Sequence, residues 1–249
     1  MIDADDVFVP EWPLPNGVRV LITTRRGGVS RGAYASLNLG LHVGDDPLAV
    51  AENRRRVAAM LPGEPTWLNQ VHGTAVFAND GDTHETIAPA ADAATTRRAG
   101  RPCAVLAADC LPILFSDERG SCVAAAHAGW RGLAAGVIER TIEAMQVAPQ
   151  RVIACLGPAI GATAFEVGQE VVDAFAVAGP GSRAGFRVSA DRPGKYLADI
   201  YALARQRLSA AGVEQVHGAG WCTLSAPERF FSYRRDGQTG RMAAIIWRE

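Results

Sequence analysis

The chain has 249 residues, of which 48% are hydrophobic and 20% charged, a balance typical of a globular protein with a substantial core. The net charge of −1 excludes a broad basic surface that would attract nucleic acid or an anionic membrane, so an anionic substrate would need a local cluster of arginines. The first residues lack the basic start and apolar stretch of a signal peptide, and no apolar run is long enough to cross a bilayer. The five cysteines are scattered and odd in number, so we expect a reduced, soluble, cytoplasmic protein.

Hydrophobic periodicity and turn residues predict groups of strands separated by helices. A strand over residues 18–24 precedes a glycine-rich turn, and Asp45 or Asp46 caps a helix that has Pro47 in its first turn. Residues 195–210 keep the spacing of an amphipathic helix. In chain order, the predicted elements are strand 18–24, a helix from 46 to about 60, strands 67–71, 75–78, 103–108, 113–116 and 122–126, helix 132–146, strand 152–156, helices 169–176 and 195–210, and strand 242–247.

The predicted strands come in local groups, with a hairpin-like connection at residues 117–120. This grouping favours an α+β fold with a mixed β-sheet core and flanking helices over a doubly wound parallel sheet. No repeat, low-complexity tract or linker divides the sequence. We therefore expect a single domain over residues 1–249.

Three potential metal ligands stand at or next to the ends of predicted strands. His72 follows strand 67–71, Cys110 follows the run 103–108, and His127 ends the run that begins at 122. Two imidazoles and one thiolate form a good three-ligand zinc site with a fourth position open to water or substrate. A structural zinc site usually has four protein ligands, often in close pairs, and the sequence contains no such pair. If these residues bind zinc, the site is therefore expected to be catalytic and not structural.

The same residues allow other interpretations. Cys110 and His127 could be the nucleophile and base of a cysteine hydrolase, with Asp109 or another acid orienting the imidazole, and only a need for His72 separates this interpretation from a metal site. A cysteine in an apolar run can also be a small core residue, and a histidine at a strand end can simply satisfy a hydrogen bond. The other histidines, which we expect to be structural or solvent-facing, are His42, His84 and His217.

The motifs around the three residues resemble the laccase-domain family, long described as polyphenol oxidases and now as purine nucleoside phosphorylases. They are Asn69-Gln70-Val71-His72-Gly73, Ala108-Asp109-Cys110-Leu111-Pro112 and Ala126-His127-Ala128-Gly129-Trp130-Arg131-Gly132. Further matching motifs, from residues 27–30 to residues 231–236, extend the similarity over nearly the whole chain in order. The departures are small: Phe165 stands where the family often has Tyr, and Cys155 is an ordinary apolar substitution.

The resemblance implies zinc bound by His72, Cys110 and His127. It also implies phosphorolysis of adenosine, inosine and S-methyl-5′-thioadenosine, with an accompanying adenosine deaminase activity. Zinc can polarise the departing purine, but the sequence lacks the Glu and paired cysteines of the familiar zinc deaminases. Five histidines are too few for a blue-copper centre together with a further copper cluster, so copper is expected only as an alternative occupant of the zinc site.

Phosphorolysis also needs cationic and backbone donors for the attacking phosphate. Arg131 is the first candidate, because it follows His127 by four residues and lies between two glycines. Arg25 and Arg26 are the second, because the following Gly27-Gly28 turn can expose N–H groups to an anion, although surface ion pairs would explain these two arginines equally well. The expected partners are therefore a small-molecule nucleoside and phosphate, with no nucleic acid and no membrane.

Two other function classes stay open at this point. A Cys–His hydrolase could act on peptidoglycan precursors, because bacterial relatives of the resembled family have been linked to cell-wall editing. A non-catalytic module could use zinc only to support folding or a partner interface. The sequence indicates neither the preferred nucleoside nor the oligomeric state.

Overall fold

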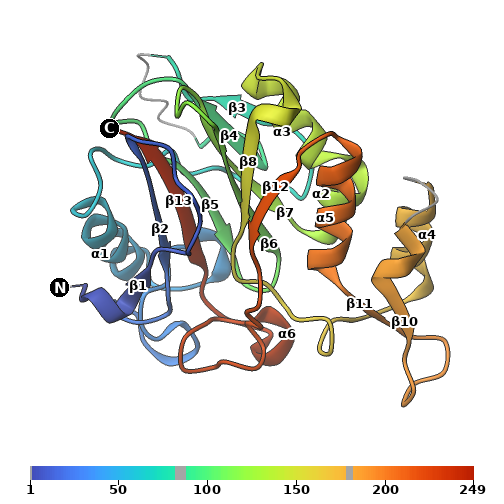
Figure 1. Cartoon of the computed structure of the whole chain (residues 1–249). Helices are drawn as coiled ribbons and strands as arrows, with labels where there is room; N and C mark the ends of the chain where they lie inside the picture. Colours follow the sequence, from blue (N-terminus) through green and yellow to red (C-terminus); the bar gives the residue numbers. More distant parts are fainter. Residues whose placement is uncertain (1, 82–87, 178–181) are drawn as a thin grey trace.

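The computed structural model describes residues 2–81, 88–177 and 182–249, and His84 therefore lies outside the described residues. Within these ranges the strands form three sheets (Figure 1). The six-stranded sheet has the order β12 (Gln215–Gly218), β8 (Val152–Leu156), β6 (Leu111–Asp117), β7 (Val123–Ala128), β4 (Ala93–Thr96) and β3 (Val76–Ala78). The four-stranded sheet has the order β1 (Val7–Phe8), β2 (Val18–Thr23), β13 (Met242–Arg248) and β5 (Cys103–Ala107), and the three-stranded sheet has the order β10 (Phe186–Val188), β11 (Tyr196–Ala198) and β9 (Glu166–Val167).

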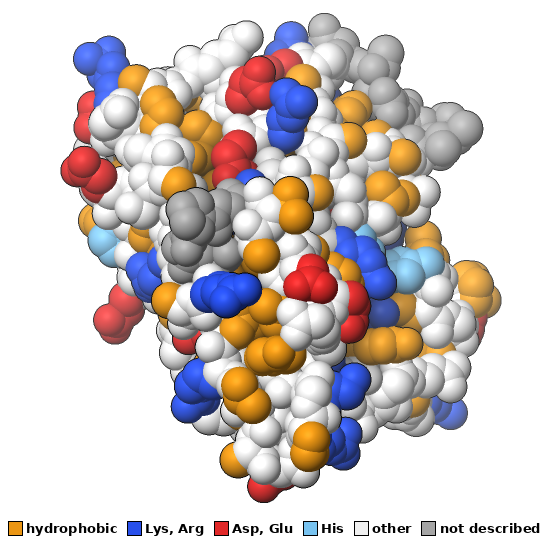
Figure 2. Space-filling model, turned by 90° about the vertical axis from the view of Figure 1, so that its right-hand side faces the viewer, with side chains coloured by type: hydrophobic (Ala, Val, Ile, Leu, Met, Phe, Trp, Pro, Cys, Tyr) orange, Lys and Arg blue, Asp and Glu red, His pale blue; other side chains and the backbone are white. Residues whose placement is uncertain are grey.

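Helices flank the two larger sheets (Figure 1). The α-helices of the described ranges are α1 (Pro47–Ala58), α2 (Trp130–Ala135), α3 (Val137–Met145), α4 (Gln169–Val177), α5 (Ile200–Ala210) and α6 (Tyr233–Asp236). The described ranges contain no helix with both the length and the hydrophobicity needed to cross a bilayer. On the face that carries α4 and α5, acidic, basic and hydrophobic side chains are interspersed (Figure 2).

Alternating side chains bury both faces of the four-stranded sheet. Val20 and Ile22 of β2 pack with Leu114 of β6 between the two sheets. Leu21 points the opposite way and packs with Val57 of α1. Because successive residues of a strand face opposite sides, a continuous apolar run fills two separate layers of core. The four-stranded sheet is therefore enclosed between α1 and the six-stranded sheet.

The outer face of the six-stranded sheet is covered by helices. Phe115 of β6 packs with Ile138 of α3 and Leu208 of α5 in the largest cluster of buried side chains. Parallel pairing occurs between β12 and β8 and between β3 and β4, whereas the other pairs of this sheet are antiparallel. The mixed sheet core with flanking helices confirms the predicted fold class.

Two predicted helices have different boundaries in the structure. The predicted helix 132–146 is two helices, α2 and α3, because Gly136 adopts φ of 104°, which a right-handed helix cannot contain. The predicted helix 195–210 begins later, because residues 196–198 form β11, which pairs with β9 and β10. The Asp199 side chain then accepts the N–H of Ala202 and caps α5.

The predicted strand 67–71 is wrong for a reason that bears on the site. In the described residues this segment forms no continuous strand pairing. It has one isolated β-bridge at Asn69, and another lies just before it at Thr66. The N–H groups of residues 71–73 instead donate to the carboxylate of Asp92. In contrast, β7 extends two residues beyond the predicted strand 122–126, so that His127 lies inside a strand.

Candidate metal centre

Cys110 lies where the chain crosses from one sheet to the other. β5 belongs to the four-stranded sheet, and β6, which begins one residue after Cys110, belongs to the six-stranded sheet. Asp109 turns the chain with φ of 85°, a left-handed conformation that is uncommon outside glycine. Its carboxylate accepts the Thr223 hydroxyl and the backbone N–H of Arg234, both at 2.6 Å. These bonds hold the turn in place and leave Cys110 half-buried.

The acid that holds His127 is Asp92, and not Asp109, the acid that the hydrolase interpretation named first. The His127 side chain is 4% exposed, and its Nδ1 lies 2.9 Å from an oxygen of the fully buried Asp92. The same carboxylate accepts the three N–H groups of residues 71–73 at 2.7–3.2 Å. One side chain thus fixes both the imidazole of His127 and the backbone that carries His72. With Nδ1 engaged, Nε2 is the ring nitrogen left for a metal.

The three predicted ligands converge in the structure. The ligand atoms of His72, Cys110 and His127 all lie within 4.8 Å of one another. The Cys110 Sγ atom is 3.9 Å from His72 Nε2, and the two imidazole rings lie 4.9 Å apart at 82°. Tetrahedral zinc at about 2.0–2.3 Å from N and S would hold these atoms about 3.3–3.6 Å apart. The group therefore fits zinc once the side chains move closer together, and the Cys110–His72 pair is already within about 0.5 Å of the required separation.

The backbone around these side chains leaves room for such a group. A Cβ atom on Gly129 would lie only 3.0 Å from both the Cys110 Sγ atom and the His72 Cδ2 atom. His72 itself has φ of 61°, and its N–H is fixed by Asp92. Non-glycine residues in this region persist where surrounding contacts hold them, and such residues cluster at functional sites. The local backbone is therefore organised around the three side chains.

The charge states of the centre also suit a metal ligand set. Burial by itself would raise the pKa of the Cys110 thiol, but His127 and His72 together lower it. Burial by itself would lower the pKa of His127, but Cys110 and Asp92 raise it. Burial opposes the ionisation of Asp92 as well, yet the bonds from His127 and from residues 71–73 lower the pKa of this carboxyl. The sulfur is thus favoured as a thiolate, the form that binds metals.

The candidate centre lies in the wall of a cavity of about 550 Å³. Such a volume is ordinary for a small-molecule site that combines apolar walls with a few polar groups. The apolar lining includes Trp130, Ile160, Phe165 and Ile200. The basic and polar lining besides the three candidate ligands consists of His42, Gln70, Asp109, Arg131, Tyr233, Arg234 and Arg241.

Arg131, the first phosphate candidate, lines this cavity. It occupies the first turn of α2, three residues beyond the end of β7. Its guanidinium lies 4.3 Å from the ring centroid of Trp130, and the side chain is exposed. The structure therefore brings Arg131 to the same cavity as the three ligands.

Arg25 and Arg26 do not line the cavity in the described part of the chain. Arg25 donates through Nε to the carbonyl of Ala35 and through Nη1 to that of Pro227. Arg26 donates through Nε to the carbonyl of Glu228. The structure thus separates the second phosphate candidates from the candidate centre, and gives them backbone carbonyls as partners.

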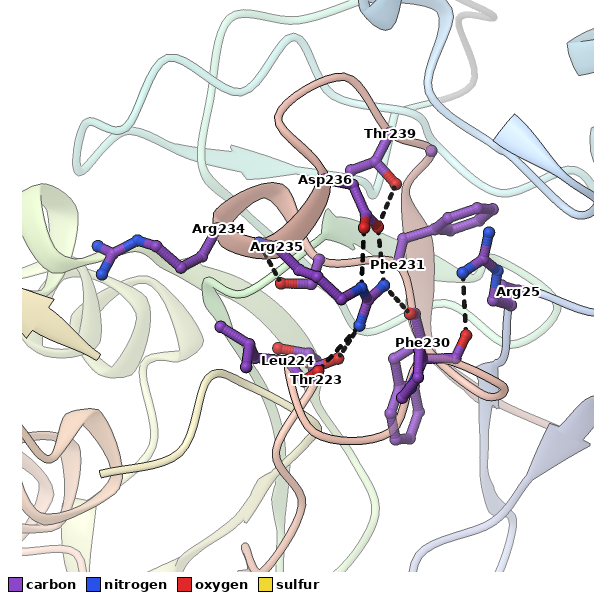
Figure 3. Close-up of polar contacts among 12 residues, drawn as sticks. Arg25, Thr223, Leu224, Phe230, Phe231, Arg234, Arg235, Asp236 and Thr239 are labelled. Atoms are coloured by element: carbon purple, nitrogen blue, oxygen red, sulfur yellow. Dashed lines mark hydrogen bonds and ion pairs between the residues drawn. The ribbon is translucent and has the colours of Figure 1, made fainter. Parts of the chain in front are cut away.

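The 220–240 segment, which forms part of the cavity wall, is held by Arg235 (Figure 3). The Arg235 guanidinium donates to the carbonyls of Thr223, Leu224 and Phe230, each at 3.0 Å. It also forms an ion pair with Asp236. Arg235 thus holds the segment that carries Tyr233 and Arg234, two residues that line the cavity.

Several residues of the site were not predicted. His42, expected to be structural or solvent-facing, lines the cavity from a short 3-10 helix, Leu41–Val43. His217, by contrast, lies in β12 and does not line it. One feature of the sequence could have pointed to Asp92, which is the only acidic residue in the run of small residues 88–96. No feature of the sequence pointed to Arg241, because it lies more than a hundred residues from any of the three candidate metal ligands.

Comparison with known proteins places this architecture in a described group. A family model described as multi-copper polyphenol oxidoreductase laccase matches residues 19–249. A Pseudomonas aeruginosa protein named purine nucleoside phosphorylase PA4543 is 52% identical over 240 residues, which cover 96% of this chain and 97% of that protein. An Escherichia coli protein named purine nucleoside phosphorylase YfiH is 52% identical over 243 residues, which cover 97% and 98%.

Solved structures show the same fold. The crystal structure of Neisseria meningitidis protein NMB0706 superposes with a TM-score of 0.93 at 52% identity, covering 98% of this chain and 99% of that one. The crystal structure of YlmD from Geobacillus stearothermophilus superposes with a TM-score of 0.86 at 37% identity, covering 94% and 93%.

Proposed function

Because the chain belongs to the multi-copper polyphenol oxidoreductase laccase family, and its relatives are named purine nucleoside phosphorylases, we propose that it cleaves purine nucleosides with phosphate. The observation that carries the proposal is the convergence of His72, Cys110 and His127 in the wall of a cavity with both apolar and basic lining. The apolar part suits a purine ring, and the basic part suits a phosphate.

We propose zinc, in preference to copper, as the metal that the three candidate ligands bind. Two imidazoles and a thiolate with an open fourth position form a typical catalytic zinc set. A blue-copper centre usually adds an axial methionine, and none of the methionines in the described ranges lines the cavity. Copper remains an alternative occupant of the same ligands. When bound, zinc supplies an electrophile that polarises the departing purine.

The residues of the chain then bind and orient the reactants. Trp130 and Phe165 offer aromatic surface to the base, and Arg131 offers positive charge to the phosphate. Bond cleavage leaves an oxocarbenium-like ribose, so the reactants must be aligned before the C1′–N9 bond breaks. Asp92 keeps the imidazole of His127 oriented while this happens.

We propose adenosine, inosine and S-methyl-5′-thioadenosine as substrates, with adenosine deamination as a secondary activity. Deamination needs an acid–base group, and Asp109 is the one carboxylate among the described lining residues. Both of its oxygens already accept hydrogen bonds, which supports a minor role for this reaction. We also propose that the enzyme works in the cytoplasm, where nucleosides and phosphate are both available.

The two alternative functions explain fewer of the observed features of the site. A metal-free hydrolase acting on peptidoglycan precursors needs only Cys110 and His127 and leaves the approach of His72 unexplained. A non-catalytic zinc module leaves the large cavity beside the ligands unexplained. Both are distinguishable from the proposal by the same assay.

The test is an assay of the purified, metal-analysed protein with each of the three nucleosides, with and without phosphate. The proposal expects ribose 1-phosphate, or its 5-methylthio derivative, to form only when phosphate is present. Release of free ribose at the same rate without phosphate would contradict it. Full phosphorolysis after complete removal of metal would contradict the assigned role of zinc.

A further inference from the structure

Arg241 differs from the other arginines of the cavity in how it is held. Its Nη1 donates to the carbonyls of Thr239 and Gly240, both at 3.0 Å. Its aliphatic stem crosses Gly40 so closely that a Cβ there would lie 2.9 Å from the Arg241 Cγ atom. The side chain is half-buried and lines the cavity. Its guanidinium is therefore fixed before any ligand arrives.

The hydrogen bonds of Arg241 leave one edge of the guanidinium open. Both protein bonds use Nη1, and neither Nε nor Nη2 has a partner among the described residues. No carboxylate in the described ranges forms an ion pair with it. The Nε–Nη2 edge is a planar fork of two parallel donors, which matches two oxygens of a phosphate.

Arg241 and the three candidate metal ligands line the same cavity. Burial lowers the pKa of Arg241, and the charges of Cys110 and Asp109 act in the opposite direction, so these groups are within electrostatic reach. His42 lines the same cavity. Its burial lowers its pKa, and the positive charge of Arg241 lowers this pKa further. The backbone N–H of Leu39 donates to the carbonyl of Arg241, so the segment that carries His42 lies beside Arg241 in the cavity wall.

We propose that the attacking inorganic phosphate binds in a bidentate manner to the Nε–Nη2 edge of Arg241, with His42 beside it. This inference rests on the proposed function and names the residue that positions its second substrate. A phosphate oxygen forms the new bond to ribose C1′ while the C1′–N9 bond breaks. The bonding electrons stay on the purine, which also takes up the proton that hydrogen phosphate loses.

The other basic residues of the cavity fit this role less well. Arg131 is exposed and stacks on Trp130 without a described hydrogen bond, so it would have to be ordered by the ligand. Arg234 is exposed and donates through Nη1 to the carbonyl of Glu166. Both can add positive charge to the cavity, whereas Arg241 offers a fixed fork.

The test compares Arg241→Met and Arg241→Lys with a matched control, Arg54→Met, all zinc-loaded. Arg54 is also a half-buried arginine near His42, but it donates to Leu39, stacks on Trp67 and does not line the cavity. Two quantities are measured: the KM for phosphate at saturating inosine, and the Kd of inorganic phosphate by calorimetry without nucleoside. The KM for inosine at saturating phosphate shows whether the nucleoside site is intact.

Arg241→Met is expected to raise the KM and Kd for phosphate about tenfold or more, with little change in the KM for inosine. Arg241→Lys, which keeps the charge and loses the fork, should also weaken phosphate binding, and Arg54→Met should not. Equal phosphate affinity in Arg241→Met and wild type would overturn the inference, as would a wild-type protein that binds no phosphate. A wild type that binds phosphate through Arg241 but forms no ribose 1-phosphate would refute the proposed function and leave this site standing.

Discussion

The Oδ1 atom of Asp92 lies 2.9 Å from the Nδ1 atom of His127, and the pair is buried beneath the candidate metal centre. The same carboxylate fixes the backbone of residues 71–73, which carries His72. Asp92 thus couples two ligands that come from distant parts of the sequence. Such partners orient a metal-binding imidazole and raise its basicity.

Asp92→Asn is therefore expected to weaken zinc binding by about 10- to 100-fold, since the amide cannot accept as many N–H bonds or support the imidazole as a carboxylate does. Competition with a chromophoric chelator measures the affinity. Asp117→Asn is the matched control, because Asp117 is also a buried carboxylate that accepts a backbone N–H, from Cys122, but lies away from the centre. Equal zinc affinities for Asp92→Asn and wild type would show that Asp92 has no such role.

Gly129→Ala tests whether the backbone leaves space for the metal ligands. The added Cβ would lie 3.0 Å from the Cys110 Sγ atom, so either the sulfur or the helix start must move. We expect zinc affinity to fall by about tenfold or more, as is usual when ligand orientation is disturbed. In Gly73→Ala the nearest atoms are at 3.5 Å, an ordinary contact, and zinc affinity should change little. A larger loss of zinc affinity in Gly73→Ala than in Gly129→Ala would contradict this geometry.

Arg235→Met tests the support behind the cavity wall. It removes the donor shared by three carbonyls and the partner of Asp236, so we expect the free energy of unfolding to fall by about 2–4 kcal/mol. The KM for inosine should rise as well, because Tyr233 and Arg234 lose their support. Urea unfolding and steady-state kinetics measure the two effects. Arg140→Met, which removes an exposed ion pair on α3, should change stability by less than about 0.5 kcal/mol and leave KM unchanged.

The charge state of metal-free Cys110 predicts a pH dependence. Since His127 and His72 lower the pKa of this thiol, its alkylation by iodoacetamide should reach half its maximal rate well below pH ~8.5, the pKa of an ordinary cysteine. His127→Ala should move that midpoint upward. Zinc should block the reaction, and Cys110→Ser should remove it. A midpoint that does not move in His127→Ala would show that the imidazole does not stabilise the thiolate.

The sequence predicted most strands because they are continuous apolar runs, and it predicted α1 from its Asp–Pro start. It did not predict β4, because its two alanines and two threonines lack a strong strand pattern, and it also missed the short strands β1, β9, β10 and β12. The break at Gly136 and the strand at residues 196–198 depend on tertiary partners that a local pattern does not contain.

The three candidate metal ligands were predicted from residue type and family resemblance, but the residues that hold them in place were not. Asp92 lies beside His127, and Arg241 lines the same cavity as the three candidate ligands. In both cases the fold brings together residues that are far apart in the sequence. Arg25 and Arg26 show the opposite case. A glycine-rich turn beside two arginines suggested an anion site, whereas tertiary contacts give both guanidinium groups backbone carbonyls as partners.

The most direct test of the account measures bound zinc and inosine phosphorolysis side by side in wild type, His72→Ala, Cys110→Ala and His217→Ala. His217 lies outside the cavity and serves as the control histidine. We expect about one zinc per chain and full activity in wild type and His217→Ala, with both lost in the other two variants. Full phosphorolysis by a metal-free His72→Ala protein would contradict the central claim that these side chains form one catalytic metal centre.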